Sequence, residues 1–238
     1  MDGTLKLQFA DRVLNFTYPE SGNAGLHISN ILQGKDYPIL KIDGYQPNII
    51  IDVGANVGAA TFFFMNNYPN AEYYCYEPSL SNYRYLQKNI EGCTNVHTFN
   101  FGLSDDSKHV RLYLGNSQCL QNSVIPSIEV TEKFEDVELR SANSELGKII
   151  RDKCILKIDT EGCELPILKD IEDHLKKVDI VYLEYHSESD RIALEQLLNP
   201  GFSLWYASAT MIHRGNSGYL SKKLIEGSPE LAQWEIKH

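Results

Sequence analysis

Acidic side chains recur along this chain at the ends of short apolar runs or directly after them. They are Asp52, Glu77, Asp159, Glu161 and Glu184. Carboxylates can accept hydrogen bonds from hydroxyl groups, remove a proton or balance a cation. If the apolar runs are parallel strands of one sheet, their carboxyl ends meet along one edge, where ligands bind. The spacing therefore predicts a single site assembled from several strand ends.

The first of these acids precedes a glycine-containing turn, in the string Ile51-Asp52-Val53-Gly54-Ala55-Asn56-Val57-Gly58. Gly54 would let the backbone turn tightly and approach a ligand, and Gly58 would let the next helix pack closely. Asn56 stands where a Gly-x-Gly-x-x-Gly dinucleotide fingerprint has its second glycine. Asp52 would repel a pyrophosphate at the following helix N-terminus and attract a cationic ligand. The string therefore favours a cationic nucleoside over a dinucleotide.

Two later strand ends fit the rest of a nucleoside. Glu77 ends a run roughly twenty residues after the glycine turn, where an acid can accept hydrogen bonds from both ribose hydroxyls. Ser104 and Asp105 follow the third run and could meet the adenine edge. Ser-Asp pairs are also common in ordinary turns, so turn formation alone would explain this pair.

The best candidates for proton transfer lie in two segments near the end of the apolar series. Asp159 follows the run Leu156-Lys157-Ile158, and Glu184 and His186 lie two residues apart on an extended segment, so they project to one face. Histidine titrates near neutrality and can take a proton from a hydroxyl. We expect His186 to act as the base, with Glu184 or Asp159 orienting it.

The same cluster offers an alternative based on a metal ion. Asp159, Glu161, Glu184 and His186 could together bind Mg²⁺ or Mn²⁺, and the ion would acidify a bound hydroxyl. The metal-free hypothesis is preferred. Glu164 lies at the start of a predicted helix, where the helix dipole by itself favours an acid.

The elements that position these residues follow from periodicity. Residues 4–18 alternate between apolar and polar and predict a β-hairpin, which a short helix at 27–32 follows within an N-terminal cap, residues 1–46. Residues 47–238 form the main domain, in which strands alternate with helices. The expected strands are 49–53, 72–77, 95–101, 108–114, 137–140, 154–159 and 178–184, with an antiparallel pair at 202–207 and 211–214; the helices are 56–67, 79–90, 164–175 and 189–198. This order predicts an α/β, Rossmann-like, doubly wound and mostly parallel sheet.

Composition excludes several classes of protein. The net charge of −10 and the absence of a Lys/Arg-rich run argue against nucleic acid as a partner. The apolar runs are too short to span a membrane, and the N-terminus does not have the pattern of a signal peptide. The five cysteines are widely spaced and form no Cys-x-x-Cys pair, which indicates reduced thiols and a cytoplasmic location.

Taken together, the strings IIIDVGANVGAAT, YYCYEP, FGLSDD, LKIDTEGCELPILK and YLEYH resemble the FkbM family of methyltransferases over residues 48–207. The resemblance implies a class I methyltransferase fold and S-adenosylmethionine as cofactor. It implies that Asp52, Gly54, Asn56 and Gly58 line the methionine half, that Glu77 holds the ribose, and that Ser104 and Asp105 lie near the adenine. Asp159 and Glu161 match the family's Asp-x-Glu-Gly string beside the transferred methyl group. Known members imply O-methylation of a small molecule, such as a natural product or a sugar.

Two other functions remain open on the residues alone. A nucleotide-dependent oxidoreductase could use the same sheet, although Asp52 and Asn56 speak against it. A non-catalytic domain could bind the cofactor without turnover, since fold-level analogy does not fix activity. The cap, the loop 115–127 and a C-terminal segment could wall the acceptor pocket; the aromatic and basic residues of that segment are Trp205, Tyr206, His213 and Arg214. The sequence does not indicate the acceptor's identity or the oligomeric state.

Overall fold

The structure is a computed structural model that describes residues 2–9, 12–20, 22–115 and 130–232. Strands and helices alternate through most of the chain, as the sequence predicts. The expected loop 115–127 lies outside the described residues except for Gly115. Within the described ranges, no helix is both long and apolar enough to cross a membrane.

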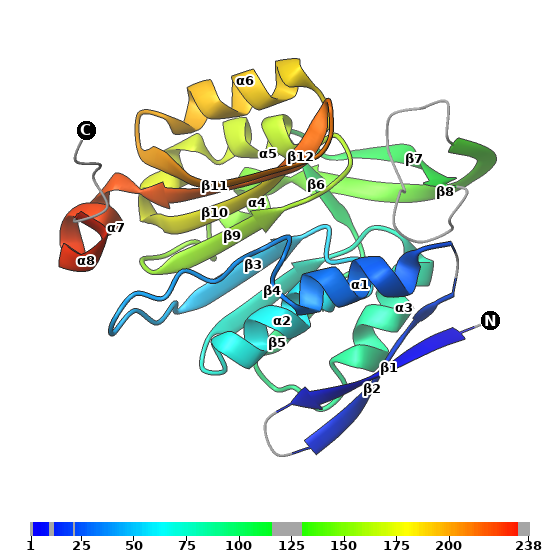
Figure 1. The fold of residues 1–238 in the computed structure, drawn as a ribbon. Helices are drawn as coiled ribbons and strands as arrows, with labels where there is room; N and C mark the ends of the chain where they lie inside the picture. The colour runs from blue at the N-terminus through cyan, green and yellow to red at the C-terminus, as the bar shows by residue number, and fades with distance from the viewer. Residues whose placement is uncertain (1, 10–11, 21, 116–129, 233–238) are drawn as a thin grey trace.

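A seven-stranded sheet forms the centre of the fold (Figure 1). In spatial order its strands are β11 (Phe202–Met211), β12 (Arg214–Ser221), β10 (Val178–Tyr185), β9 (Cys154–Ile158), β3 (Ile49–Val53), β4 (Glu72–Tyr76) and β5 (Val96–Phe99). The strands from β10 to β5 pair in parallel, and the hairpin β11–β12 joins β10 in antiparallel fashion. The predicted α/β, Rossmann-like, mostly parallel sheet is therefore confirmed.

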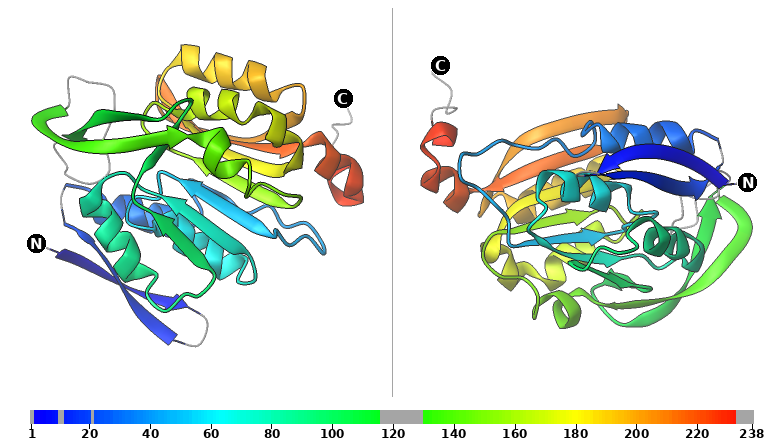
Figure 2. Two further views of the ribbon diagram at one scale, coloured as in Figure 1. Left: turned by 180° about the vertical axis from the view of Figure 1, so that it is seen from behind. Right: turned by 90° about the horizontal axis from the view of Figure 1, so that it is seen from below.

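Helices cover both faces of this sheet, because alternate strand residues point to opposite sides. On one face, Ile49 and Ile51 belong to the same apolar cluster as residues of α4 (Ala142–Leu146), α5 (Glu164–Asp170) and α6 (Glu188–Leu198). On the other face, Ile50 packs in a cluster with residues of α2 (Ala59–Asn67) and α3 (Leu80–Asn89). Figure 2 shows the two helical layers from behind and from below. The doubly wound arrangement leaves the carboxyl edge of the parallel strands open for a ligand.

The N-terminal cap has the predicted composition of a hairpin and a helix. Strands β1 (Asp2–Phe9) and β2 (Arg12–Pro19) pair antiparallel, and α1 (Ala24–Leu32) follows them. Phe16 and Ile28 of the cap are buried in one cluster with Val57 and Phe62 of the main domain. In Figure 1, α1 lies across the front of the sheet and the hairpin lies beside α3. This cap therefore packs directly on the residues that follow the glycine turn.

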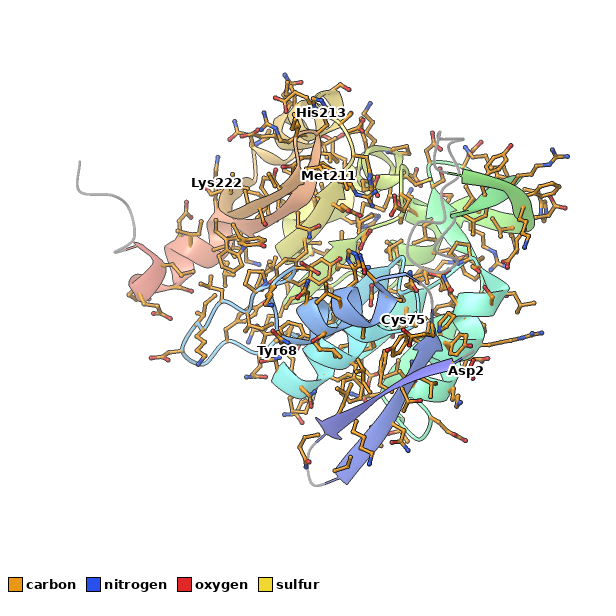
Figure 3. All side chains as sticks on the ribbon, turned by 45° about the vertical axis from the view of Figure 1, so that its right-hand side comes forward. Asp2, Tyr68, Cys75, Met211, His213 and Lys222 are labelled. Atoms are coloured by element: carbon orange, nitrogen blue, oxygen red, sulfur yellow. The ribbon has the colours of Figure 1, made fainter. Side chains whose placement is uncertain are left out.

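Two elements begin later than expected because the backbone before them is not helical or extended. The helix predicted from residue 56 begins at Ala59, since Asn56 has a φ of 52° and Gly58 a φ of 90°. The strand predicted at 211–214 is also displaced: Met211 ends β11, and β12 begins at Arg214. The sequence Arg-Gly-Asn-Ser-Gly that opens β12 has little intrinsic strand preference, which explains the error. Figure 3 shows Met211 and His213 together at this hairpin, far from Asp2.

Several other bounds differ from the prediction. The strand expected at 95–101 ends at Phe99 as β5, because the Asn100 side chain donates to the carbonyls of Glu77 and Pro78 where the ladder would continue. A separate short strand, β6 (Gly102–Ser104), follows it. Strand β6 pairs with β8 (Val130–Ser141), which also pairs with β7 (Lys108–Gly115), in a separate three-stranded sheet. The predicted helix 164–175 is α5 followed by a 3₁₀ segment, Glu172–Lys177, in which Leu175 is buried. Two short helices, α7 (Lys222–Gly227) and α8 (Pro229–Ala232), follow β12.

Candidate active site

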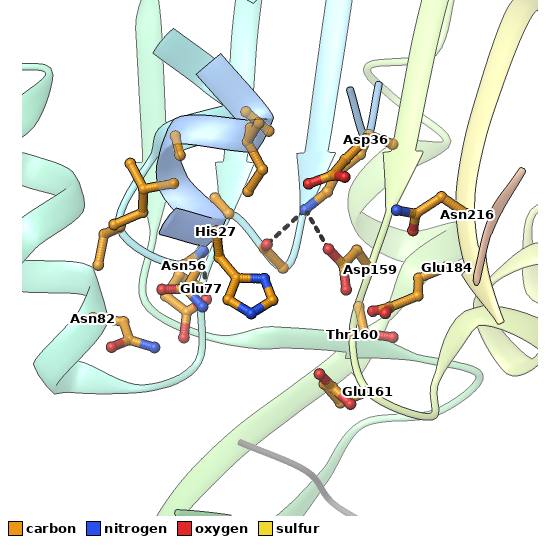
Figure 4. Close-up of a pocket in the computed structure, with 18 of the residues that line it drawn as sticks. His27, Asp36, Asn56, Glu77, Asn82, Asp159, Thr160, Glu161, Glu184 and Asn216 are labelled. Carbon is orange, nitrogen blue, oxygen red and sulfur yellow. Dashed lines mark hydrogen bonds and ion pairs between the residues drawn. The ribbon is translucent and has the colours of Figure 1, made fainter. Parts of the chain in front are cut away.

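A cavity of about 450 Å³ lies at the carboxyl ends of the parallel strands. This volume falls in the range of about 300–1,000 Å³ that is usual for small-molecule and cofactor sites. Figure 4 shows its two ends, with His27 of α1 between them. The Glu77 end contains Asn56, Glu77 and Asn82, and the Asp159 end contains Asp36, Asp159, Thr160, Glu161, Glu184 and Asn216. The predicted site at the strand ends is thus one continuous cavity.

At the Glu77 end, the backbone fixes the acid in place. Oε2 of Glu77 accepts a hydrogen bond of 2.8 Å from the amide of Asn56, and Oε1 accepts one of 2.9 Å from the amide of Ser79. Burial raises the pKa of Glu77 to about 7, although these two amides partly offset that effect. Each oxygen retains a lone pair, so Glu77 can accept further hydrogen bonds from a ligand's hydroxyl groups.

Two glycines determine the shape of this region. A Cβ atom on Gly54 would lie 1.8 Å from the carbonyl oxygen of Asp159, and Gly54 has a φ of 78°, so only glycine fits there. A Cβ atom on Gly58 would lie 2.8 Å from a methyl carbon of Leu86 in α3. Gly54 therefore allows the ends of β3 and β9 to approach, and Gly58 allows the start of α2 to pack against α3.

The two residues expected near the adenine do not line the cavity. Ser104 is buried in β6 and its hydroxyl donates to Asp105, whose side chain is largely exposed. The neighbouring residues Gly102 and Leu103 line the cavity instead, together with Leu139 of β8. This wall is apolar and could pack against a planar ring.

A buried lysine in the cavity wall links the segment around Asp52 to the segment around Asp159. Strands β3 and β9 place Asp52 directly beside Lys157. The Lys157 ammonium lies 2.9 Å from Asp52 Oδ1, 2.7 Å from the carbonyl oxygen of Gly54 and 3.7 Å from Asp159 Oδ2. Asp52 also accepts a 2.6 Å hydrogen bond from Thr61. Asp52 is fully buried and supports Lys157 from behind, while Lys157 and Asp159 line the cavity.

The Asp159 and Glu184 carboxyls interact, and their pKa values are shifted in opposite directions. Burial alone would raise the pKa of Asp159, but the Lys157 ammonium and hydrogen bonds with Glu184 and Tyr37 outweigh it and hold this pKa below its usual range. Burial, together with the negative charge of Asp159, raises the pKa of Glu184 well above its usual range. Of the two carboxyls, Asp159 is therefore the one that is ionised at neutral pH, and Glu184 is the one that keeps its proton to higher pH.

Arg214, at the start of β12, joins two of the remaining acids. Its Nε donates to Glu184 at 2.7 Å, and its second guanidinium nitrogen donates to Glu161. Ligand atoms of Glu161, Glu184 and His186 lie within 4.8 Å of one another, as a metal site would require. The guanidinium already supplies a positive charge beside Glu161 and Glu184, and the raised pKa of Glu184 reduces the negative charge there, so this cluster does not need a metal ion to offset repulsion between its acids.

His186 lies behind this acidic wall and is not among the residues that line the cavity. Its ring nitrogens are 3.6 Å from Glu161, 3.4 Å from Glu164 and 3.8 Å from Glu184. Burial lowers the pKa of His186, but the hydrogen bond and the charge of Glu164 raise it more, so the net shift is upward. This upward shift favours the protonated imidazole, which makes His186 a poorer candidate for the base.

The Glu164 side chain stabilises the local backbone. Its carboxylate accepts hydrogen bonds from the amides of Thr160 and Gly162 and from the Thr160 hydroxyl, and it thereby closes the turn between β9 and α5. This agrees with the interpretation of Glu164 as an acid favoured at a helix start.

Sequence reasoning brought the strand ends together but did not single out several residues that line the cavity, among them Tyr37 and Lys157. Lys157 could have been recognised, because a lysine within an apolar strand run must have buried partners. Tyr37, whose hydroxyl donates to Asp159 Oδ2 at 2.6 Å, lies in a segment without regular periodicity, so no sequence signal marked it. Three of the predicted acids line the cavity together: Asp159, Glu161 and Glu184. Five other predicted residues do not line it: Asp52, Gly58, Ser104, Asp105 and His186.

A doubly wound sheet with a cavity at its carboxyl edge is the architecture of class I methyltransferases. The sequence profile described as the methyltransferase FkbM domain matches residues 52–213. The chain therefore belongs to the FkbM methyltransferase domain family, and it is a methyltransferase. The cap, including Tyr37, precedes the matched residues.

Curated relatives agree with this assignment. Methyltransferase 1 of Beauveria bassiana (strain ARSEF 2860) is 25% identical over 181 residues, which cover 66% of this chain and 73% of the relative. Methyltransferase sdnD of Sordaria araneosa is 27% identical over 192 residues, which cover 65% of this chain and 73% of the relative.

Solved structures share the fold. The crystal structure of a methyltransferase FkbM from Methylobacillus flagellatus KT aligns with a TM-score of 0.53 and 15% identity, over 77% of this chain. The alignment covers only 45% of that larger chain. The Methanococcus jannaschii fibrillarin pre-rRNA processing protein aligns with a TM-score of 0.52 and 10% identity, over 92% of this chain and 83% of its own. At these identities the similarity concerns the fold alone.

Proposed function

We propose that this protein is an S-adenosylmethionine-dependent O-methyltransferase that acts on a hydroxyl group of a small molecule, such as a natural product or a sugar. The observation that carries the proposal is the ionised Asp159 carboxylate in the same cavity as the backbone-fixed Glu77. The first can receive a proton from an acceptor, and the second can receive the hydroxyls of a nucleoside.

The residues of the cavity fit S-adenosylmethionine. Glu77 would accept hydrogen bonds from the ribose, the apolar wall at Gly102 and Leu103 would pack against the adenine, and the turn at Gly54 would allow the methionine half to approach the backbone. When bound, this cofactor supplies a methyl group on a positively charged sulfur. The carboxylates of the Asp159 end complement that positive charge.

The same geometry selects the base. An acceptor hydroxyl must lose its proton as it gains the methyl group, and we assign that proton to Asp159, which lines the cavity and is ionised at neutral pH. A hydrogen bond with Glu184 and the nearby Lys157 ammonium hold Asp159 in place. His186, the base expected from the sequence, would instead contribute through its contacts with Glu161 and Glu184.

The acidic wall also favours one kind of acceptor. Asp36, Asp159, Glu161 and Glu184 all face the cavity, so this end offers many hydrogen-bond acceptors. Hydroxyl-rich or cationic molecules would be bound there, whereas phosphates of a nucleic acid would be repelled. A neutral molecule with several hydroxyl groups fits these charges, and its reacting hydroxyl would lie at Asp159.

Isothermal titration with S-adenosylmethionine and S-adenosylhomocysteine tests the cofactor. We expect micromolar binding that Glu77→Ala weakens by more than about ten-fold, because charged hydrogen bonds are lost. Glu72→Ala is a matched control, since Glu72 lies at the other end of β4 and pairs with His97 on the surface. Failure of the folded wild-type protein to bind either ligand, together with binding of NAD(H) in the same cell, would contradict the proposal and favour an oxidoreductase.

A second experiment tests whether a metal participates. Because the Arg214 guanidinium contacts both Glu161 and Glu184 and supplies a positive charge there, we expect methyl transfer to a panel of sugars and hydroxylated natural products to persist in EDTA. Activity that EDTA removes and added Mg²⁺ or Mn²⁺ restores would contradict the metal-free mechanism.

A further inference from the structure

We propose that Tyr37 is a positioning residue that fixes the Asp159 carboxylate from outside the family-matched part of the chain. The proposal rests on the proposed function, since it gives Asp159 the role of base. Tyr37 lies 122 residues from Asp159 in sequence and precedes the residues that match the family profile. The site of this protein would then be incomplete without its N-terminal segment.

The contact itself is short and buried. The Tyr37 hydroxyl donates to Asp159 Oδ2 at 2.6 Å, and the Tyr37 side chain is 3% exposed. Lys157 lies farther from the same oxygen, at 3.7 Å, because its ammonium is engaged by Asp52 and the Gly54 carbonyl. The phenol therefore makes a closer contact to this oxygen than the lysine does.

The Tyr37 ring is held by its surroundings, so its hydroxyl has little freedom to leave. The ring packs edge-on against Tyr182, with centroids 5.9 Å apart, and lies 6.2 Å from the ring of Phe64. The Lys157 ammonium lies 5.7 Å from the Tyr37 ring centre, within the range of a cation–π contact. Sheet, helix and lysine thus all restrain one side chain of the cap segment.

Two further tyrosines attach the backbone of this segment to the sheet. The Tyr206 hydroxyl donates to the carbonyl of Lys35 at 2.7 Å, and the Tyr182 hydroxyl donates to the carbonyl of Pro38 at 2.6 Å. These anchors lie on β11 and β10 and bracket Tyr37 on both sides. The segment from Lys35 to Pro38 is therefore fixed at three points, and its central point is the contact with Asp159.

The consequence for Asp159 is a single orientation. Tyr37 and Lys157 both contact Oδ2, which fixes how the carboxylate is turned and leaves Oδ1 without a contact from either of them. Without the phenol hydroxyl, the carboxylate could rotate toward Lys157, and the oxygen that faces the acceptor would change. A loss of alignment of this kind lowers kcat more than it lowers cofactor affinity.

The test is a double-mutant cycle that combines Tyr37→Phe with Asp159→Ala, measured by urea unfolding and by titration of S-adenosylhomocysteine. Tyr37→Phe keeps the ring and removes only the donor. We expect it to raise the unfolding equilibrium constant by roughly ten-fold, the usual effect of a hydrogen bond to a charged group. In the Asp159→Ala background the same change should have an effect below about two-fold, because the partner is already gone.

Tyr73→Phe is the matched control, because the buried Tyr73 hydroxyl donates to the carbonyl of Tyr68, away from the cavity. Its effect on unfolding should add to that of Asp159→Ala, and it should leave kcat unchanged. Tyr37→Phe should lower kcat by roughly ten-fold while the cofactor Kd changes by less than about two-fold.

Three results would overturn the proposal: additive effects of Tyr37→Phe and Asp159→Ala on unfolding, a wild-type kcat in Tyr37→Phe, or a loss of cofactor affinity as large as the loss of kcat. A wild-type chain that methylates no acceptor would instead refute the proposed function. The unfolding cycle does not depend on turnover, so it separates these two failures.

Discussion

The two ends of the cavity are built in different ways. At the Glu77 end, backbone amides of Asn56 and Ser79 hold a single acid, and the parts come from two neighbouring strand ends. At the Asp159 end, side chains hold one another, and Tyr37, Asp159 and Arg214 come from distant parts of the chain. Backbone contacts follow from local sequence, whereas a network of charged side chains depends on the whole fold. We therefore expect the Glu77 end to tolerate substitutions that disrupt the Asp159 end.

The largest effect should come from the proposed base. Asp159→Asn keeps the shape of the side chain but removes the ionised oxygen, so kcat should fall about 10²- to 10⁴-fold, the usual contribution of general base catalysis. Affinity for S-adenosylhomocysteine should change little, because the Glu77 end is intact. Steady-state kinetics and calorimetry on the same preparations check both. If Asp159→Asn lowered the affinity for S-adenosylhomocysteine as much as it lowered kcat, the two ends of the cavity would not act independently.

Stability should depend strongly on the buried lysine. Lys157→Met removes the cation that lies 2.9 Å from the buried Asp52 carboxylate, so we expect a loss of about 3–5 kcal/mol in the free energy of unfolding. Asp52→Asn added to Lys157→Met should recover part of that loss, because the unpaired charge is removed. Urea unfolding monitored by circular dichroism measures both variants. A loss below about 1 kcal/mol would mean that water reaches this pair.

Ligand binding at the Glu77 end should depend on pH. Because the pKa of Glu77 is raised to about 7, the carboxylate is mostly protonated at pH 6 and mostly ionised at pH 8. Ribose hydroxyls donate to the ionised form, so S-adenosylhomocysteine should bind several-fold more tightly at pH 8 than at pH 6. Calorimetry at both values measures this, and Glu77→Gln should lose the dependence.

The same raised pKa has an effect of opposite sign on folding. Between its unfolded value of about 4.5 and its folded value of about 7, Glu77 binds more protons in the folded protein than in the unfolded chain. Its contribution to the free energy of unfolding therefore decreases as the pH rises through this window and is constant above it.

The smallest effect should come from His186. His186→Ala removes contacts of 3.4 Å or longer behind the acidic wall and leaves Arg214 in place, so kcat should fall by only about two- to five-fold. A loss as large as that of Asp159→Asn, in the same acceptor assay, would restore His186 as the base.

The difference between the two ends of the cavity also explains which features the sequence could predict. The parallel strands of the sheet and the residues of the glycine turn follow from local periodicity and from backbone conformation, and both were predicted, whereas β12 was placed too early. Tyr37 could not be, because its role arises only when a segment without periodicity packs on two strands. Ser104 and Asp105 were placed at the adenine, but β6 leaves the main sheet after Asn100 and turns them away from the cavity.

The β11–β12 hairpin has a consequence for the order of folding. Strand β12, the last in the chain, lies between β10 and β11, so β11 reaches the described sheet only through β12. The hairpin is local and can form within microseconds, but it must dock on β10 as a unit. During synthesis, Glu161 and Glu184 therefore emerge before the arginine that joins them. We expect the acid-lined wall to order last, only after residue 214 has been translated and the hairpin has closed.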